Sequence, residues 1–299
     1  MAQNDLLTEL ATRPLCCDGA MGTQLLARGL KGGKCGMLWN VDRTSDVREI
    51  HEAYRSAGAD LVTTNSFGGS RFTLDRHGLA DRADELNRAA AEIARVPAGE
   101  TGWVLGDVGP FGDFLQPLGE TTPDQLRDIF RQQIEALLAG GADAILLETM
   151  SDPAEAVIGI EAAKACETSV PAIVTYAFQK TASGSFRTMM GTTVDEAIQR
   201  AADSGAQIIG ANCGTRLNLN DYVELAKQIV AVAGHAYVMI QPNAGRPHTE
   251  DGRTVYDATP EQMAMTTSQL LSSGVRIVGG CCGTTAEHLV AISRALKSL

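Results

Sequence analysis

The sequence predicts an α/β protein built as a single (β/α)₈ (TIM) barrel, because three features recur along residues 1–299. Eight apolar runs rich in β-branched residues show no alternation, as is typical of strands buried on both faces. Segments with helical spacing separate these runs, and eight strand–helix units in one chain are typical of the barrel. Nearly every run ends in a polar or glycine-rich motif, which is where barrels build their active sites. The eight runs span residues 15–20, 59–67, 103–110, 143–150, 171–178, 206–214, 236–245 and 275–283.

The connecting segments carry helix signals in the expected order. Apolar residues recur at helical spacing from 50 to 57 and from 126 to 137. Thr122-Pro123 and Thr259-Pro260 each combine a capping residue with proline at the first helical position. A doubly wound open sheet is the alternative architecture for the same pattern, and no linker divides the chain, so we expect one domain over 1–299. Helices are expected to stop before a strand at Gly58, Gly141 and Gly205.

Composition and charge exclude several classes of function. With 44% hydrophobic and 20% charged residues the chain is typical of a globular protein, and no apolar window is long enough to span a bilayer. The formal net charge of −11 disfavours binding to nucleic acid or to an anionic membrane surface. The N-terminus lacks the apolar core of a secretory leader, so we expect a cytoplasmic protein. The sequence gives no prediction of oligomeric state.

Three of the seven cysteines lie beside glycine at the end of an apolar run: Cys213 in NCG (212–214), and Cys281 and Cys282 in GGCCG (279–283). An odd number of cysteines in a leaderless chain argues against a disulfide framework. In a barrel the ends of the sixth and eighth strands face each other across the mouth. Adjacent cysteines reach one ion only if the chain bends, which the flanking glycines permit. Three thiolates with an open fourth position describe a catalytic zinc site; a vicinal disulfide and buried inert thiols are the alternatives.

This set of ligands favours one kind of chemistry. Soft thiolates prefer zinc to magnesium or manganese. Three anionic ligands leave a negative centre, which acidifies water poorly but holds a substrate thiolate that stays nucleophilic. We therefore expect S-alkylation rather than hydrolysis.

The motifs resemble those of the homocysteine S-methyltransferase family, which includes the homocysteine-binding domain of cobalamin-dependent methionine synthases and the bacterial betaine–homocysteine methyltransferases. The resemblance implies a barrel in which Cys213, Cys281 and Cys282 bind zinc. It also implies that homocysteine supplies its sulfur as the fourth ligand and accepts a methyl group to give methionine. The GGCCG and NCG pair is the most specific marker. The similarity runs from DGAMGT (18–23) through TNSFGG (64–69), GDVGP (106–110), LET (147–149), GSFRTMMG (184–191), GANCG (210–214) and PNAG (242–245) to GGCCGTT (279–285).

The resemblance further implies a binding site for the amino-acid end of the substrate. Asp18 of the DG motif and Glu148 of the LET motif would bind the ammonium group. The backbone around Gly19, Ala20 and Thr23 would receive the carboxylate. Both assignments are chemically sound, because carboxylates pair with ammonium groups and backbone amides in a glycine turn pair with carboxylates.

Two asparagines complete the set of candidate binding residues. The resemblance places Asn243 of PNAG near the open position of the metal. Asn65 also lies at a strand end and is a candidate for substrate binding, with hydrogen bonding to the loop backbone as its alternative role.

The methyl donor is left open by the sequence. Methionine synthases carry folate, cobalamin and activation domains that these 299 residues do not contain, so a corrinoid donor is expected on a separate protein. A small onium donor such as betaine or a sulfonium would need an aromatic cage. Two other classes of function stay open: a zinc–thiolate barrel that acts on another thiol or as a lyase, and a non-catalytic binding module. The aromatic residues in loops after strands are Trp39, Phe67, Phe72, Phe111 and Phe114.

Overall fold

The computed structural model describes residues 5–166, 170–214, 217–250 and 253–298. Eight parallel strands lie in one sheet in the order β1-β12-β9-β8-β5-β4-β3-β2, and each falls within one of the eight predicted runs. The strands are β1 (Leu15–Cys16), β2 (Leu61–Thr63), β3 (Trp103–Val108), β4 (Ala144–Met150), β5 (Ala172–Tyr176), β8 (Ile208–Asn212), β9 (Tyr237–Gln241) and β12 (Ile277–Val278).

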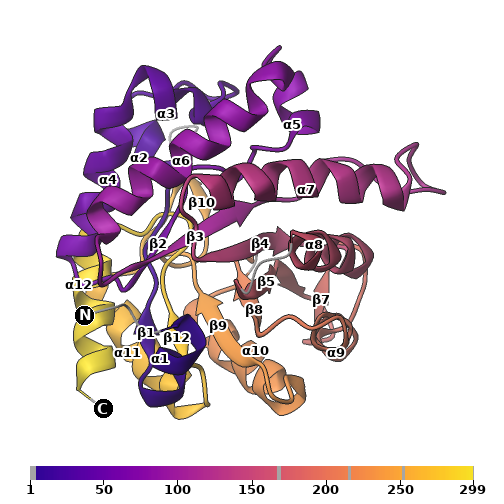
Figure 1. Cartoon of the computed structure of the whole chain (residues 1–299). Coiled ribbons are helices and arrows are strands. Elements are labelled where there is room, and N and C mark those ends of the chain that lie inside the picture. The colour runs from indigo at the N-terminus through magenta and orange to yellow at the C-terminus, as the bar shows by residue number, and fades with distance from the viewer. Residues whose placement is uncertain (1–4, 167–169, 215–216, 251–252, 299) are drawn as a thin grey trace.

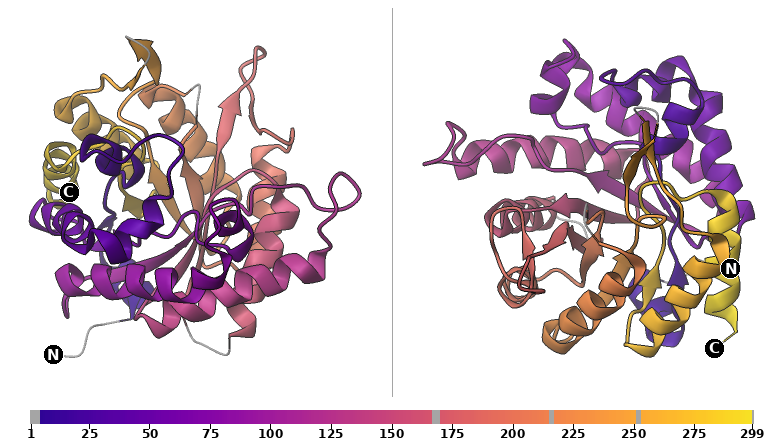
Figure 2. Two further views of the ribbon diagram at one scale, coloured as in Figure 1. Left: turned by 90° about the horizontal axis from the view of Figure 1, so that it is seen from above. Right: turned by 180° about the vertical axis from the view of Figure 1, so that it is seen from behind.

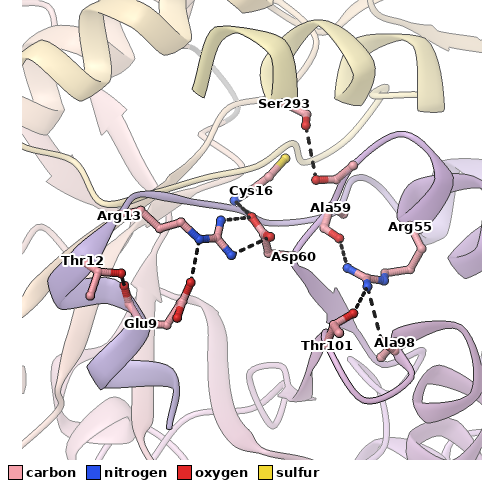
Figure 3. Close-up of polar contacts among 11 residues, drawn as sticks. Glu9, Thr12, Arg13, Cys16, Arg55, Ala59, Asp60, Ala98, Thr101 and Ser293 are labelled. Atoms are coloured by element: carbon pink, nitrogen blue, oxygen red, sulfur yellow. Dashed lines mark hydrogen bonds and ion pairs between the residues drawn. The ribbon is translucent and has the colours of Figure 1, made fainter. Parts of the chain in front are cut away.

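The first and last strands of this order also meet, which closes the sheet into a barrel. Cys17 forms a parallel bridge with Leu61, and the backbone N–H of Asp60 donates to the carbonyl of Cys16 at 2.7 Å. The Asp60 carboxylate holds the same seam, because it accepts bonds from the guanidinium of Arg13 and from the backbone N–H of Cys16 (Figure 3). The predicted barrel is thereby confirmed, and the open-sheet alternative is wrong.

A ring of helices surrounds the strands, in chain order around the barrel (Figures 1 and 2). The short helices α2, α3 and α5 lie toward the end of the barrel opposite α1 (Figure 1). Two β-hairpins follow β5 and β9: β6 (Phe178–Lys180) with β7 (Phe186–Thr188), and β10 (His248–Glu250) with β11 (Arg253–Val255). Among the described residues, no helix is both long and apolar enough to cross a membrane. The α-helices are α1 (Leu6–Thr12), α2 (Gly22–Ala27), α3 (Trp39–Asp42), α4 (Thr44–Ser56), α5 (Arg71–Asp75), α6 (Ala83–Ala98), α7 (Pro123–Ala139), α8 (Pro153–Ala165), α9 (Val194–Asp203), α10 (Leu219–Val232), α11 (Pro260–Ser272) and α12 (Ala286–Lys297), with short 3₁₀ turns at Gly36–Leu38 and Ala80–Arg82.

The predicted helix boundaries are confirmed. Thr122 and Thr259 each cap a helix whose first residue is proline, and each forms a reciprocal capping box with the glutamine three residues later. The chain leaves α4, α7 and α9 through glycines in the left-handed region, with φ values of 103° at Gly58, 99° at Gly141 and 91° at Gly205.

Two apolar layers hold the barrel together. Side chains that alternate along the strands fill the interior, among them Leu61, Leu105, Leu146 and Ile208, and α1 closes its lower end with Leu6 and Leu10. A larger cluster fills the space between the outer faces of the strands and the helices. Because the interior layer is apolar on the side of α1, the polar groups inside the barrel lie at the opposite, carboxyl ends of its strands.

Candidate metal centre and substrate cavity

The interior of the barrel turns polar at the carboxyl ends of its strands. In β3 the inward positions run from Leu105 in the apolar interior to Asp107, and in β4 they run from Leu146 to Glu148. Asn212 and Gln241 end β8 and β9 in the same way and are buried. Burying so many polar groups is costly unless they bind one another or a ligand, so this layer marks the candidate site.

The three predicted metal ligands come together at this layer. The Sγ atoms of Cys213, Cys281 and Cys282 all lie within 4.8 Å of one another. The sulfur of Cys282 is 3.6 Å from that of Cys213 and 4.0 Å from that of Cys281. A tetrahedral zinc ion with Zn–S bonds of about 2.3 Å places its sulfur ligands about 3.8 Å apart. The cluster therefore has the spacing of a tetrahedral thiolate site.

The chain bends after β12, as adjacent cysteine ligands require. The hydroxyl and the backbone N–H of Thr284 both donate to the carbonyl of Cys281, at 2.7 Å and 3.1 Å. Within this turn Gly283 has φ = 82°, and a Cβ there would lie 2.2 Å from the ring of Tyr256. Glycine is thus required both for the backbone conformation and for the close packing.

Hydrogen bonds hold the segments that carry the cysteines. The amide of Asn212 donates to the sulfur of Cys281 at 3.7 Å. The hydroxyl of Tyr222, which is buried, accepts from the backbone N–H of Gly214 at 3.0 Å, next to Cys213. Hydrogen bonds from the thiols of Cys213 and Cys281 lower the pKa of Cys282. The thiolate form of Cys282 is accordingly favoured within this cluster.

A cavity of about 470 Å³ joins the cysteine cluster to the rest of the polar layer. Its volume lies in the range of small-molecule sites. The three cysteines, Glu148, Asp107 and Gln241 line it from the barrel. Thr63 lines it from the end of β2, and Asn65 and Phe67 line it from the segment that follows. Gly19, Ala20 and Thr23 line it at the start of α2, and Lys34 and Cys35 line it from the loop between α2 and the 3₁₀ turn.

The acidic residues of this layer are held in a strongly desolvated environment. Burial raises the pKa of Asp18 to about 7, although hydrogen bonds from Thr63 oppose the rise. Burial and the neighbouring charges of Cys282 and Asp18 raise the pKa of Glu148 to about 8. Burial and the charges of Glu148 and Asp18 raise the pKa of Asp107 well above its usual value. A ligand that brings a cation would relieve this cost.

Asp18 and Glu148 differ in how they face the cavity. Glu148 lines it. Asp18 is 1% exposed and does not line it. Its two carboxyl oxygens accept hydrogen bonds from the backbone N–H and the hydroxyl of Thr63, both at 2.8 Å. The structure thus places only one of these two predicted carboxylates in direct reach of a ligand.

The residues expected to receive a carboxylate lie at the cavity wall. The backbone N–H of Ala20 already donates to the hydroxyl of Thr284 at 3.0 Å, and the hydroxyl of Thr23 accepts from Gly283 at 3.3 Å. A Cβ on Gly19 would lie 2.8 Å from the Thr284 hydroxyl, so only glycine fits there. These contacts tie the start of α2 to the cysteine turn.

The two asparagines have different surroundings. The amide nitrogen of Asn65 donates to the carbonyl of Gly36 and to the side chain of Asn40, so it anchors the loop above the cavity. Asn243 is buried and does not line the cavity, and its amide nitrogen donates to the carbonyl of Gly214 at 3.4 Å. Its Oδ1 atom has no hydrogen-bond partner within the described part of the chain. A free oxygen acceptor therefore lies next to the segment that carries Cys213.

Several cavity residues were not among the predicted site residues, including Asp107, Cys35 and His77. Asp107 belongs to the GDVGP motif, and the alternation of β3 from Leu105 onward would have placed it inside the barrel. Cys35 and His77 line the outer part of the cavity from loops, where no periodic signal exists.

The aromatic residues considered for an onium cage are mostly elsewhere. Phe67 lines the cavity, but Trp39 and Phe111 are buried in the core. Phe72 packs against Phe111 with 5.6 Å between ring centroids, and Phe114 lines a separate groove beside α8. These five side chains do not form a cage around the cavity.

Comparison with known proteins shows the family of this chain. The family model described as homocysteine S-methyltransferase matches residues 15–296. The methionine synthase of Mycobacterium tuberculosis is 32% identical over 99% of this chain, and that of Mycobacterium leprae is 32% identical over 98%. The chain spans about a quarter of the length of these two relatives, 26% and 25%.

A solved structure has the same fold. The metallated form of the homocysteine methyltransferase MmuM from Escherichia coli aligns with a TM-score of 0.79 at 24% identity, covering 97% of this chain and 99% of that one. A methyltransferase from Methanosarcina mazei aligns with a TM-score of 0.63 at 11% identity, covering 98% and 97%. The family model matches nearly the whole chain, and the chain therefore belongs to the homocysteine S-methyltransferase family, a family of methyltransferase enzymes.

Proposed function

We propose that residues 1–299 act as one homocysteine-binding barrel domain that transfers a methyl group to the sulfur of homocysteine and yields methionine. The observation that carries this proposal is the shared cavity: a three-cysteine cluster and the carboxyl group of Glu148 line the same 470 Å³ space. A thiol-binding group and an ammonium-binding group so arranged suit a small amino-acid thiol.

We assign Zn²⁺ to Cys213, Cys281 and Cys282, because the sulfur spacing and the all-thiolate donor set fit this ion. Zinc, when bound there, would lower the pKa of the substrate thiol so that it remains a thiolate at neutral pH. Asn243, whose Oδ1 atom lacks a hydrogen-bond partner in the described part of the chain, is the candidate neighbour of the fourth position.

The residues of the chain would orient the substrate. Glu148 would bind the ammonium group, and the backbone around Gly19, Ala20 and Thr23, which line the cavity, would receive the carboxylate. Asp18 supports this site through Thr63. Fixing the thiolate in one orientation supplies much of the rate gain expected for such a transfer.

The methyl group would arrive from the open side of the cavity. Its donor is a small onium compound, such as betaine or a sulfonium, or a methyl-corrinoid on a separate protein. Among the proposed onium-cage residues only Phe67 lines the cavity. An onium donor would therefore depend on the acidic residues more than on aromatic faces.

X-ray absorption at the zinc edge tests the proposal directly. On adding homocysteine to the zinc-loaded protein, one nitrogen or oxygen neighbour should be replaced by sulfur. An unchanged spectrum would instead favour a lyase, an enzyme acting on another thiol, or a non-catalytic binding module.

A donor screen identifies the source of the methyl group. The zinc-loaded protein is incubated with homocysteine and either betaine, S-methylmethionine, another sulfonium or methylcobalamin, and methionine is quantified. Methionine from one of the onium compounds would assign that donor. Methionine from none of them would favour the corrinoid protein.

A further inference from the structure

Tyr256 has no role in the site as predicted, yet it lies against the turn that carries the last two cysteines. It directly follows the hairpin of β10 and β11 and is half-buried. Its side chain packs on the backbone of this turn, because a Cβ on Gly283 would lie 2.2 Å from Cγ and 2.5 Å from Cβ of Tyr256. Its hydroxyl forms a hydrogen bond with the side chain of Cys282. Tyr256 therefore contacts one of the three assigned metal ligands, although it does not line the cavity itself.

Hydrogen bonds hold the segment that follows β11 in a fixed position relative to the cysteine turn. The N–H of Ala258 donates to the carbonyl of Ala244 at 3.0 Å, and the N–H of Ala244 donates to the carbonyl of Cys282 at 3.0 Å. The ring of His288 on α12 joins the same parts of the chain. Its Nδ1 atom accepts from the backbone N–H of Thr285 at 3.1 Å, so in the neutral ring Nε2–H donates to the carbonyl of Ala258 at 2.8 Å. Support of this kind is typical of a segment that orients a metal ligand.

Cys281 has a comparable donor from a different part of the barrel. The amide of Asn212, at the end of β8, donates to the sulfur of Cys281 at 3.7 Å. Asn212 and Tyr256 thus approach the cluster on separate segments, and each contacts a different sulfur. Both adjacent cysteines of the GGCCG motif are therefore paired with a side-chain donor of their own.

A cluster of thiolates around one ion creates a problem of selectivity. The thiolate is the nucleophilic form of a thiol, so the sulfurs of the protein compete with the sulfur of the substrate for the methyl group. A hydrogen bond to a thiolate draws charge from the lone pair that would attack, and the nucleophilicity of sulfur falls with its basicity. A side-chain donor on a protein sulfur therefore favours transfer to the sulfur of the substrate.

We propose that Tyr256 is a positioning residue of the metal centre, whose hydroxyl donates to the sulfur of Cys282, holds that sulfur as a ligand and makes it a poorer nucleophile than the sulfur of the substrate. The inference rests on the proposed function and deepens it, because it states how a thiol substrate is methylated while a thiolate that holds the ion is not. Tyr256 acts only through Cys282, since it does not line the cavity.

Alkylation of the cysteines tests this inference without a methyl donor and without turnover. The whole chain, with zinc in excess and without homocysteine, is treated with iodoacetamide. A sulfur that reacts forms a bond with the methylene carbon of the reagent, and iodide leaves with the electron pair of the C–I bond. Peptide mass spectrometry gives the rate of labelling at each cysteine. The quantity compared is the rate at Cys282 divided by the rate at Cys213.

Tyr256→Phe keeps the ring that packs on Gly283 and removes only the hydroxyl. Because the ring is kept and the residue is half-buried, the variant should fold as the wild type does. The labelling ratio should rise about three- to tenfold, since the loss of a hydrogen bond to a charged group is partly expressed in nucleophilicity. Tyr256→Leu removes the ring as well and should raise the ratio at least as far. A rise in Tyr256→Leu with none in Tyr256→Phe would show that the ring rather than the hydroxyl protects Cys282, and would overturn the proposal.

Tyr237→Phe is the matched control, because it removes the hydroxyl of a half-buried tyrosine at the start of β9, at the opposite end of the barrel. Its labelling ratio should equal that of the wild type. An unchanged ratio in zinc-loaded Tyr256→Phe, including one that results from equal rises at Cys213 and Cys282, would contradict the inference. If the wild type holds no zinc, the proposed metal site itself fails; if it holds zinc and Tyr256→Phe is labelled as the wild type is, only the present inference fails.

Discussion

The side chain of Asn212 forms two hydrogen bonds with Thr149. Its amide nitrogen donates to the Thr149 hydroxyl at 2.7 Å, and its carbonyl oxygen accepts from the Thr149 backbone N–H at 3.1 Å. Thr149 (φ = 61°) and Cys213 (φ = 51°) are the non-glycine residues with positive φ in the described ranges. Such conformations cost about 1–3 kcal/mol each and persist where surrounding contacts hold them. Asn212 therefore joins the strained end of β4, after Glu148, to the strained segment after β8 that carries Cys213.

Replacing this asparagine should weaken metal binding. Asn212→Ala removes the bond to the sulfur of Cys281 as well as both bonds to Thr149. Loss of a group that orients a ligand typically lowers metal affinity by about ten- to a hundredfold. Competition with a chromophoric zinc chelator measures the change.

Asn218→Ala provides the comparison for that experiment. Asn218 caps α10 and its side chain accepts from the backbone N–H of Asp221, so its loss should lower the free energy of unfolding by about 1 kcal/mol. Its zinc affinity should stay that of the wild type. Equal zinc affinity in both variants would mean that Asn212 has no part in holding the ligands.

Most of the architecture could be predicted from the sequence because it follows from periodicity. Buried strands appear as apolar runs, and the polar residue that ends each run must lie at the same end of the barrel. Cys213 and Cys281 could be brought together by this logic alone. The bend that adds Cys282 depends on a turn at Thr284, but the neighbouring glycines signalled it.

What escaped prediction depends on individual side-chain contacts. Asp18 and Asp107 both follow apolar residues. Nothing in the sequence indicates that Thr63 donates to both carboxyl oxygens of Asp18, whereas Oδ1 of Asp107 has no hydrogen-bond partner among the described residues. The segment that carries Cys35 has no periodic pattern, and its position over the cavity depends on the bonds from Asn65 to Gly36 and Asn40. Long-range polar contacts of this kind are absent from any local pattern.

Two cysteines of the same cavity should respond differently to substitution. Cys282→Ala removes a member of the three-sulfur cluster and should abolish stoichiometric zinc binding. Cys35→Ala changes a cysteine that lines the cavity but lies outside that cluster, so the bound zinc should remain at the wild-type level. Elemental analysis of the dialysed proteins provides the measurement. Full zinc occupancy in Cys282→Ala would refute the ligand assignment.

Gly210 in β8 should tolerate no side chain. A Cβ at this position would lie 1.6 Å from the carbonyl oxygen of Met239 in β9, so Gly210→Ala must push two adjacent strands apart. Overpacking of this kind costs about 1–3 kcal/mol or more, and urea denaturation should show it. Gly22→Ala is the control, because a Cβ there would meet no atom within 4 Å. A variant at Gly210 as stable as the one at Gly22 would contradict the close approach of β8 and β9.

His51 should make stability depend on pH in a way that substitution can isolate. It is fully buried on α4, neither ring nitrogen has a partner within the described residues, and burial lowers its pKa to about 4. Above about pH 6.5 the ring is neutral in both the folded and the unfolded states. Between that value and pH 4 the unfolded state takes up the proton first. As the pH is lowered through this range, His51 therefore lowers the free energy of unfolding by up to about 3 kcal/mol.

Other buried groups oppose this trend, so the His51 contribution must be measured as a difference between two proteins. Asp18 and Glu155, whose pKa values burial raises to about 7, favour the folded state as pH falls. The free energy of unfolding is therefore compared between the wild type and His51→Leu at pH 7.5 and at pH 5, where most of the proposed decline has occurred. On acidification, the free energy of unfolding of His51→Leu should rise relative to that of the wild type. A difference independent of pH would show that His51 is protonated in the folded protein as easily as in the unfolded chain.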